Sequence, residues 1–312
     1  MTPDPSSLKT PAKMSPAAPL WYTHSYDWPM LYNLVHGLIP LMPRPMRFGL
    51  ANVVAAFFRR LMPREYAAAQ SNITRIRPDA DPVTTARITR SLFRHFAYYF
   101  VDLLSLNRQS LEIQQHHVHR VHGLERLQAV LESGGGFVAA TAHLGNWELA
   151  GRLLSPFGKT VNILTAPEQQ AAIQRLLREQ HTLPGLRFVS NDQAGVFVQL
   201  LMALRRGEVV AVQIDRGTGH RSDLPIDFFG APALFPSGPF ILAGAADVPV
   251  IPFFCLMRPD RLYDIHIGEA IAVARGDEEA ALRQLIRVLE HYVAKAPEQW
   301  FNFYDVWRPP TA

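Results

Sequence analysis

The feature that most constrains the fold is a change of hydrophobic periodicity after His122. Beyond this point, short runs that are apolar throughout alternate with stretches of helical spacing. Such runs predict strands buried on both faces, and the helices between them predict a sheet covered on both sides. We expect strands at 137–142, 161–165, 186–190, 209–214, 248–256 and 262–267. We expect helices at 146–154, 168–180, 194–206, 237–246 and 278–294.

The chain before His122 has a different pattern and reads as helix from about 21 to 107. Residues 1–20 are rich in Pro, Ser and Ala without a continuous apolar run, which indicates a disordered leader and not a secretory signal. The sequence thus predicts a leader (1–20), a helical, membrane-facing portion (21–122) and an α/β core (123–312), the last two packed as one unit.

Composition narrows the classes of partner. Lys and Arg exceed Asp and Glu by four, which suits an anionic membrane, a phosphate-bearing cofactor or nucleic acid equally well. No nucleic-acid-binding module is recognisable, so we expect no nucleic acid partner. The apolar run 48–58 is shorter than the roughly 20 residues that a spanning helix needs. The single cysteine, Cys255, excludes an intrachain disulfide and lies in an apolar run typical of a buried strand.

A candidate active site follows the first apolar run of the core. That run ends at His143, and a helix is expected to begin almost at once, at the edge where open α/β sheets bind ligands. From the first turn of this helix, the carboxylate of Glu148 can fold back toward the imidazole and make it a better general base. The alternative is a structural His143, with Glu148 favoured by the helix dipole alone. Spacing leaves both open.

The turn between strand and helix offers two further candidates. Gly145 permits a tight turn or the close approach of a substrate. Asn146 is a good N-cap for the helix. The backbone amides of these two residues, at the start of a helix, are candidates for holding an oxyanion.

The run His143-Leu-Gly-Asn-Trp-Glu148 resembles the H-x4-D/E signature of lysophospholipid-type acyltransferases. The amino-acid sequence of this run is similar to that of the lauroyl and myristoyl transferases of lipid A biosynthesis. Blocks that resemble the same family follow in order at 205–215, 227–230, 248–252 and 299–307, so that the resemblance covers roughly 72–307. The chain departs from the family where Arg216 follows Asp215 and where Pro236-Ser237 replaces a Thr pair.

The resemblance implies a mixed, mainly parallel sheet flanked by helices, as in glycerolipid acyltransferases. It also implies transfer of a fatty acyl chain from an acyl carrier protein or coenzyme A thioester to a hydroxyl or amine of a lipid acceptor, which is lipid A-like, a lysophospholipid or another glycolipid. His143 would be the general base and Glu148 its partner, without a covalent intermediate, a metal or any cofactor beyond the thioester co-substrate. The enzyme would lie on the cytoplasmic face of the inner membrane, peripheral or shallowly anchored.

Further substrate-binding candidates come from the matching blocks. Arg175 and Arg178 lie on a predicted helix where the family often places an arginine that faces the site; a solvated helix face is the alternative. Asp215 ends an apolar run, which favours a site-facing carboxylate paired with an arginine, or else a turn cap.

The remaining candidates follow Asp215 in the sequence. Phe229 and Gly230 would shape the acyl or acceptor pocket, as the resemblance implies. Ser237 stands just before a helix of small residues and is either a ligand or an N-cap.

Two rival functions remain at this level. Residues 114–122 carry four histidines, at 116, 117, 119 and 122, which permit a metal-dependent hydrolase. Because no acidic residue or cysteine stands nearby at familiar ligand spacing, we expect a solvated connector and no metal. The second rival is a non-catalytic lipid-binding protein on the same fold, which would tolerate the loss of His143 or Glu148.

Overall fold

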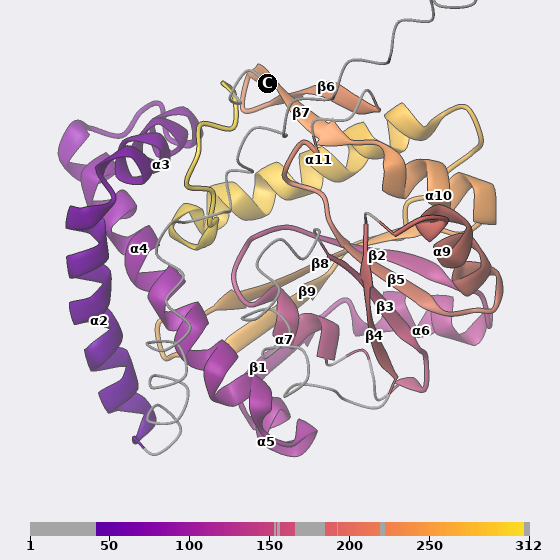
Figure 1. Ribbon diagram of the computed structural model, residues 1–312, viewed down its shortest axis with the longest axis horizontal. Helices are drawn as coiled ribbons and strands as arrows, with labels where there is room; N and C mark the ends of the chain where they lie inside the picture. The colour runs from indigo at the N-terminus through magenta and orange to yellow at the C-terminus, as the bar shows by residue number, and fades with distance from the viewer. Residues whose placement is uncertain are drawn as a thin grey trace, which may run out of the picture.

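The computed structural model describes residues 42–152, 154, 157–165, 185–191, 193–218 and 222–308. Within these ranges a seven-stranded sheet has the order β1-β9-β8-β2-β5-β3-β4 (Figure 1). Its strands are β1 (Val118–His122), β2 (Phe137–Thr141), β3 (Val161–Thr165), β4 (Leu186–Ser190), β5 (Val209–Gln213), β8 (Val250–Met257) and β9 (Tyr263–Ile267).

Neighbouring strands of this sheet are parallel except β8 and β9, which are antiparallel. The α/β fold expected from the sequence pattern, and the mixed, mainly parallel sheet implied by the family resemblance, are therefore confirmed. All six predicted strands are present, with ends shifted by no more than two residues. β8 is buried along its whole length, which explains its uninterrupted apolar sequence.

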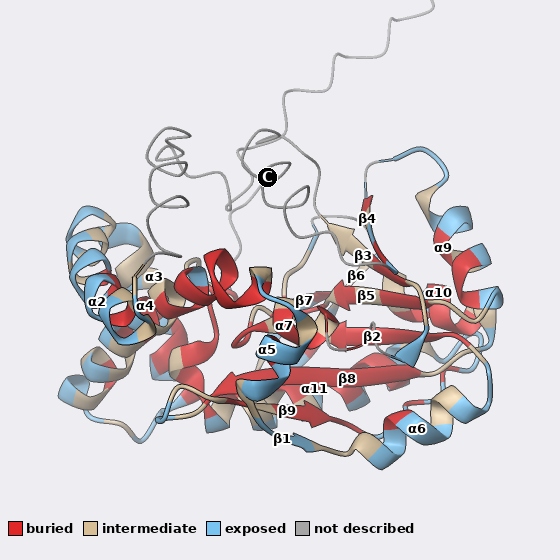
Figure 2. Cartoon of the chain, turned by 90° about the horizontal axis from the view of Figure 1, so that it is seen from below, coloured by how far each residue is buried: buried red, intermediate tan, exposed pale blue. Residues whose placement is uncertain are grey.

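Helices cover both faces of the sheet. On one face lie α9 (Val196–Arg205), α10 (Gly238–Ala246) and α11 (Glu278–Lys295), packed on a large apolar cluster. On the other face lie α6 (Leu124–Glu132) and α7 (Trp147–Arg152), packed on a second cluster. Figure 2 shows the central strands as a buried layer between these helices. The helix predicted at 168–180 lies outside the described residues, as does the leader.

The amino-terminal portion contributes α2 (Arg44–Leu61), α3 (Pro63–Ile76), α4 (Pro82–Leu104) and the short η3 (Leu106–Arg108). α4 begins where the sequence favours a start: Asp81 accepts hydrogen bonds from the amides of Val83 and Thr84, and Pro82 takes the first helical position. Side chains of α4 enter both apolar clusters, so this helix crosses the edge of the sheet. Among the described residues, no helix is long and apolar enough to cross a membrane.

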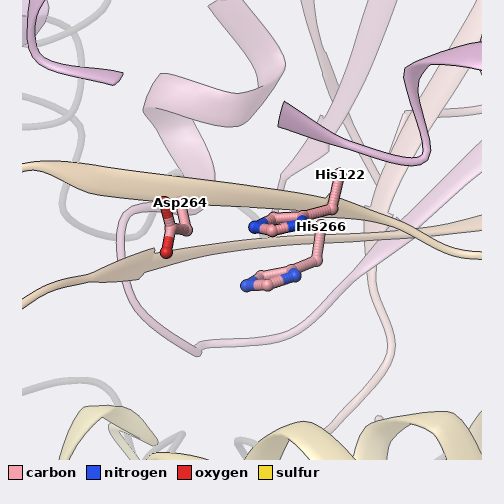
Figure 3. A group of neighbouring side chains, drawn as sticks. All are labelled: His122, Asp264 and His266. Atoms are coloured by element: carbon pink, nitrogen blue, oxygen red, sulfur yellow. The ribbon is translucent and has the colours of Figure 1, made fainter. Parts of the chain in front are cut away.

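Residues 114–122 are not the solvated connector that we expected. They form the end of α5 (Leu111–His116) and the edge strand β1, which pairs with β9 and sets His122 beside His266 (Figure 3). The expectation was wrong because the three central residues of β1 are exposed and mostly polar, so no buried run marks the strand in the sequence.

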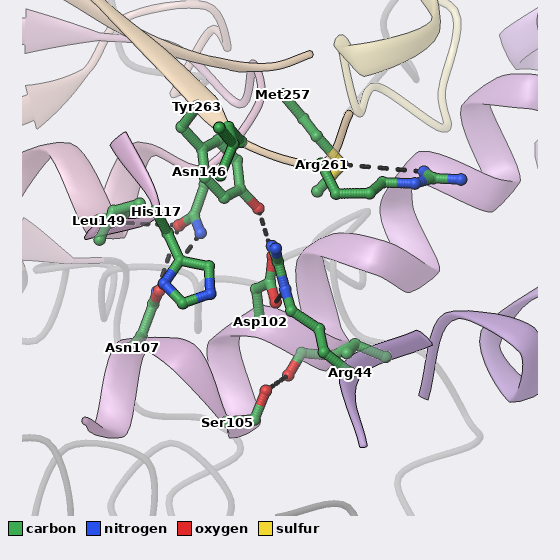
Figure 4. Close-up of polar contacts among 12 residues, drawn as sticks. Arg44, Asp102, Ser105, Asn107, His117, Asn146, Leu149, Met257, Arg261 and Tyr263 are labelled. Atoms are coloured by element: carbon green, nitrogen blue, oxygen red, sulfur yellow. Dashed lines mark hydrogen bonds and ion pairs between the residues drawn. The ribbon is translucent and has the colours of Figure 1, made fainter. Parts of the chain in front are cut away.

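A buried carboxylate joins the helical portion to the sheet. Asp102 of α4 accepts a hydrogen bond from Arg44 of α2 (Nη2 to Oδ2, 2.8 Å) and another from the hydroxyl of Tyr263 in β9 (2.7 Å), as Figure 4 shows. Close by, the side-chain amides of Asn107 and Asn146 are hydrogen-bonded to each other at 3.2 and 3.3 Å. The contacts of Asp102 thus join α4 to α2 and β9, and the asparagine pair joins η3 to the turn that follows His143.

Candidate active site

The strand register brings two side chains of the site together. β2 and β5 are parallel neighbours in which Phe137 pairs with Val209, an offset of 72 residues. His143 and Asp215 have the same offset and stand just beyond the carboxyl ends of the two strands. Their side chains therefore emerge level with each other, at the edge where open α/β sheets bind ligands.

Asp215 is a buried carboxylate surrounded by N–H donors. It accepts from Nδ1 of His143 at 2.8 Å and from the backbone amide of the same residue at 3.1 Å. Its second oxygen accepts from Nε1 of Trp300 and from Nδ2 of Asn302, both at 2.9 Å. Because an ionised carboxylate only accepts, Nδ1 of His143 carries the proton and Nε2 is left with a lone pair. The side chain of His143 is 17% exposed.

The charges around this pair favour a neutral imidazole. Burial lowers the pKa of His143, and the nearby guanidinium of Arg216 lowers it further, while Asp215 raises it; the balance lies below the usual range. Burial alone would raise the pKa of Asp215, but His143, Arg216 and the hydrogen bond from Asn302 outweigh it and lower this pKa. Both shifts favour a neutral imidazole beside an ionised carboxylate.

Arg216 is held by the carboxyl-terminal segment. Its Nε donates to Oδ1 of Asn302 at 2.8 Å, and its Nη2 donates to the carbonyl of Phe301 at 2.7 Å. Burial lowers the pKa of Arg216 to about 10, so it stays charged at neutral pH. The arginine partner expected for Asp215 is thus its own neighbour in the sequence.

Glu148, the carboxylate expected to support His143, lies in the first turn of α7. The hydroxyl of Tyr99 lies 3.5 Å from Oε1 of Glu148. Burial lowers the pKa of Arg152, and the charge of Glu148 offsets only part of that lowering. The side chain of Trp147 contacts two other rings. It stacks on Tyr99, with ring centroids 4.4 Å apart, and packs edge to face against His143, with ring centroids 5.2 Å apart. Nδ1 of His143 donates its hydrogen bond to Asp215 and not to Glu148. The role of Glu148 as partner of the base stays a prediction.

Gly145 and Asn146 serve the fold of the turn. The Gly145 amide donates to the carbonyl of Gln299 at 2.9 Å, and the Asn146 amide donates to that of Cys255 at 2.8 Å. Both amides are thus engaged, which corrects the expectation that they hold an oxyanion. Gly145 has φ +65°, and a Cβ at this position would lie 2.0 Å from the carbonyl oxygen of Cys255. A glycine is therefore needed here because the backbone passes close to β8. The side chain of Asn146 caps α7 by accepting from the amide of Leu149 at 3.1 Å.

The Phe-Phe-Gly block forms a hairpin that the sequence did not predict. β6 (Asp223–Phe228) and β7 (Ala231–Pro236) are antiparallel, and Phe229 and Gly230 form the two-residue turn with φ of 50° and 74°. Positive φ at both positions is typical of a type I′ turn and explains the glycine. The role of the two residues in shaping a pocket stays a prediction.

Phe228, next to that turn, contacts the site through Trp300, with ring centroids 5.6 Å apart. Ser237 occupies the N-cap position of α10, but its side chain makes no cap bond; its hydroxyl donates to the carbonyl of Ser222 at 2.6 Å. Its role as a ligand stays a prediction. Arg175 and Arg178 lie outside the described residues.

Trp300 and Asn302 complete the site, and sequence reasoning did not single them out. They belong to the block 299–307, which stands out in the sequence only for its family resemblance, and nothing in their spacing relates them to Asp215. Below the turn, a cavity of about 10 Å³ is lined by residues that include Tyr99, Gly145 and Phe301, which is room for one water and not for an acyl chain.

Comparison with known proteins assigns the chain to a family. Phosphatidylinositol mannoside acyltransferases of two Mycobacterium tuberculosis strains, CDC 1551/Oshkosh and H37Rv, are each 27% identical to the chain over 230 residues, covering 73% of this chain and 71% of theirs. The enzyme of the same name from Mycolicibacterium smegmatis is 23% identical over 187 residues, covering 59% of this chain and 60% of its own. Residues 19–309 match the family described as bacterial lipid A biosynthesis acyltransferase, and the chain therefore belongs to that family of acyltransferases.

Proposed function

We propose that the chain transfers a fatty acyl group from a phosphopantetheine thioester, carried by acyl carrier protein or coenzyme A, to a hydroxyl of a glycolipid, with His143 as general base and Asp215 as the carboxylate that orients it. The observation that carries this proposal is the 2.8 Å hydrogen bond between Nδ1 of His143 and the buried Asp215. With Nδ1 as the donor of this bond, Nε2 is the nitrogen that can act as the base.

The reaction then needs no covalent intermediate. Nε2 of His143 removes the proton of the acceptor hydroxyl as its oxygen attacks the thioester carbonyl. The C–S bond of the resulting tetrahedral intermediate breaks, and the imidazolium returns the proton to the leaving thiolate. Asp215 stabilises the transient imidazolium. Cys255 is unsuited to act as a nucleophile, because burial and nearby Asp102 and Asp264 raise the pKa of its thiol.

A glycolipid acceptor is supported by the curated relatives, whose name states that they acylate a phosphatidylinositol mannoside. A sugar hydroxyl needs a base to become a nucleophile at neutral pH, which is the task that the His143–Asp215 pair can perform. An amine or a lysophospholipid hydroxyl would use the same chemistry.

We propose further that α2 rests on the cytoplasmic face of an anionic inner membrane. Six of its apolar side chains are exposed, and at 3.6 residues per turn they form one stripe; they are Met46, Leu50, Val53, Val54, Phe57 and Leu61. Arg47 and Arg60 border this stripe on its two sides. Basic side chains at such a border favour anionic lipids.

A basic groove next to α2 also suits an anionic partner. Between α2 and α4 lies a space of about 240 Å³ whose lining includes Arg59, Arg87, Arg90 and Arg94. Guanidinium groups bind phosphate through paired hydrogen bonds, so this groove would accept the phosphate of a lipid or of the donor.

The experiment is comparative lipid mass spectrometry of cells that carry the wild-type chain, a deletion, or the His143→Ala variant. The proposal predicts one glycolipid that is heavier by a single acyl group in the wild type and missing from the other two. The purified variant should be folded by circular dichroism and inactive in acyl transfer. Substantial transfer by folded His143→Ala, or an unchanged lipid profile in the deletion, would refute the proposal.

A further inference from the structure

A cluster of histidines outside the active site gathers around one carboxylate. His122 lies in β1, and Asp264 and His266 lie in β9. Residues two apart in a strand share a face, and the parallel register pairs His122 with His266. The three side chains therefore project from one face of the sheet at its β1 edge. The sheet order places β9 two strands from β2, which leads to His143.

The three side chains can converge on one ion. One ligand atom from each lies within 4.8 Å of the others. The two imidazole rings lie 4.6 Å apart between centroids and within 6° of parallel, and Figure 3 shows Asp264 to one side of both rings. A tetrahedral Zn²⁺ site, with bonds of about 2.0–2.2 Å, needs ligand atoms roughly 3.3 Å apart. Binding therefore requires the ligand atoms to move closer together by side-chain rotation, which the partial exposure of His122 and Asp264 permits.

The carboxylate already has the supporting contacts that metal ligands usually have. Nδ1 of His119 lies 3.1 Å from Oδ1 of Asp264, and Nη1 of Arg258 lies 3.3 Å from its Oδ2. On the other side, the ring of His266 packs on Tyr292 of α11 at 5.0 Å. Such neighbours orient the ligands and limit the reorganisation that binding requires.

We propose that His122, Asp264 and His266 bind a transition-metal ion, with Zn²⁺ the best match to two imidazoles and one carboxylate, and that His119 orients Asp264 for it. A water molecule completes the tetrahedron. The ion joins the edge strand β1 to β9 across 142 residues of sequence and stabilises that edge. It is remote from acyl transfer, so the proposal does not depend on the function proposed above.

The test is metal binding by the full chain after treatment with chelator. Isothermal titration with Zn²⁺ should give one site per chain, and Co²⁺ should give the absorption bands of a tetrahedral complex. Zn²⁺ should also raise the Tm of the wild type. His122→Ala and His266→Ala should each weaken binding by at least about tenfold and abolish the Tm shift, while His119→Ala should weaken binding less. If an alanine variant unfolds, the glutamine variant at the same position replaces it.

His116→Ala is the matched control. His116 belongs to the same histidine-rich run, but its Nδ1 lies 2.7 Å from the Glu112 carbonyl within α5. This variant should bind Zn²⁺ like the wild type. The proposal is overturned if the wild type binds no Zn²⁺ at micromolar concentration, or if the His122 and His266 variants bind as the wild type does. Equal loss in His116→Ala would also overturn it.

Discussion

An asparagine at position 215 would keep the volume of the buried aspartate and remove its charge. The two carboxylate oxygens now accept from the backbone and Nδ1 of His143, from Trp300 and from Asn302. An asparagine offers one oxygen and one NH₂ group, so at least one of these N–H groups must face another donor. If the NH₂ group faces His143, Nδ1 becomes the acceptor and the proton moves to Nε2, where a base is needed.

The expected loss of rate is large. In a Ser-His-Asp triad, the same substitution places the histidine in the wrong tautomer and lowers kcat by about 10⁴, or roughly 5.5 kcal/mol at 1.36 kcal/mol per tenfold. We expect a loss of roughly 10³- to 10⁴-fold for Asp215→Asn. The mispaired donors should also lower the free energy of unfolding by about 2–4 kcal/mol.

The assay is release of thiol from an acyl thioester in the presence of a glycolipid acceptor, with urea unfolding to confirm that the variant is folded. Glu148→Gln is the comparison, because it changes the other carboxylate without touching the 2.8 Å bond to Nδ1. We expect it to lose less activity than Asp215→Asn. A folded Asp215→Asn enzyme within tenfold of wild type would refute the reasoning. A larger loss in Glu148→Gln would make Glu148 the partner of the base.

Three other outcomes are expected. Because Arg216 lowers the pKa of His143, Arg216→Gln should move the acid limb of the kcat/KM pH profile to higher pH. Arg216→Lys keeps the positive charge and should leave this limb near the wild-type position. An unmoved limb in the glutamine variant would contradict the reasoning. Gly145→Ala should lower the free energy of unfolding by at least about 2 kcal/mol in urea, whereas Gly151→Ala, with open space around its Cβ, should change it by no more than about 1 kcal/mol. Val53→Glu on α2 should weaken co-sedimentation with anionic vesicles about tenfold. Val83→Glu on α4 is the control, because Val83 is 75% exposed but lies on another helix, and it should not weaken co-sedimentation. Equal effects of the two substitutions would count against α2 as the membrane face.

The sequence predicted the sheet well because its strands are buried on both faces. A run such as 250–257, apolar throughout, fits a central strand, and its ends were predicted to within two residues. β1 and the β6–β7 hairpin were missed for the opposite reason. β1 is mostly exposed, and the hairpin alternates buried with exposed positions and contains Pro225. Edges and exposed ribbons leave a weaker hydrophobic signal.

The site shows what local spacing can and cannot reveal. His143 and Asp215 were both recognisable as polar residues at the ends of apolar runs, which is a local property. Their pairing depends on β2 and β5 being neighbours, and no pattern within either strand specifies the strand order. Glu148 is close to His143 in sequence and was preferred as its partner on that ground. The observed bond joins residues 72 apart.

The carboxyl-terminal segment explains why this pair can be held in place. The side-chain amide of Gln299 bonds both the amide and the carbonyl of Met257 at 2.8 Å, which fixes the segment to the end of β8. From there the Phe301 amide donates to the His143 carbonyl at 2.7 Å, and Trp300 and Asn302 donate to Asp215 on either side of it. One extended stretch thus positions both the backbone of the base and the carboxylate that orients it. The donors of this stretch, on Trp300 and Asn302, converge on the carboxylate of Asp215, which is 0% exposed. Loss of that charge should therefore loosen this stretch as well as stop the reaction.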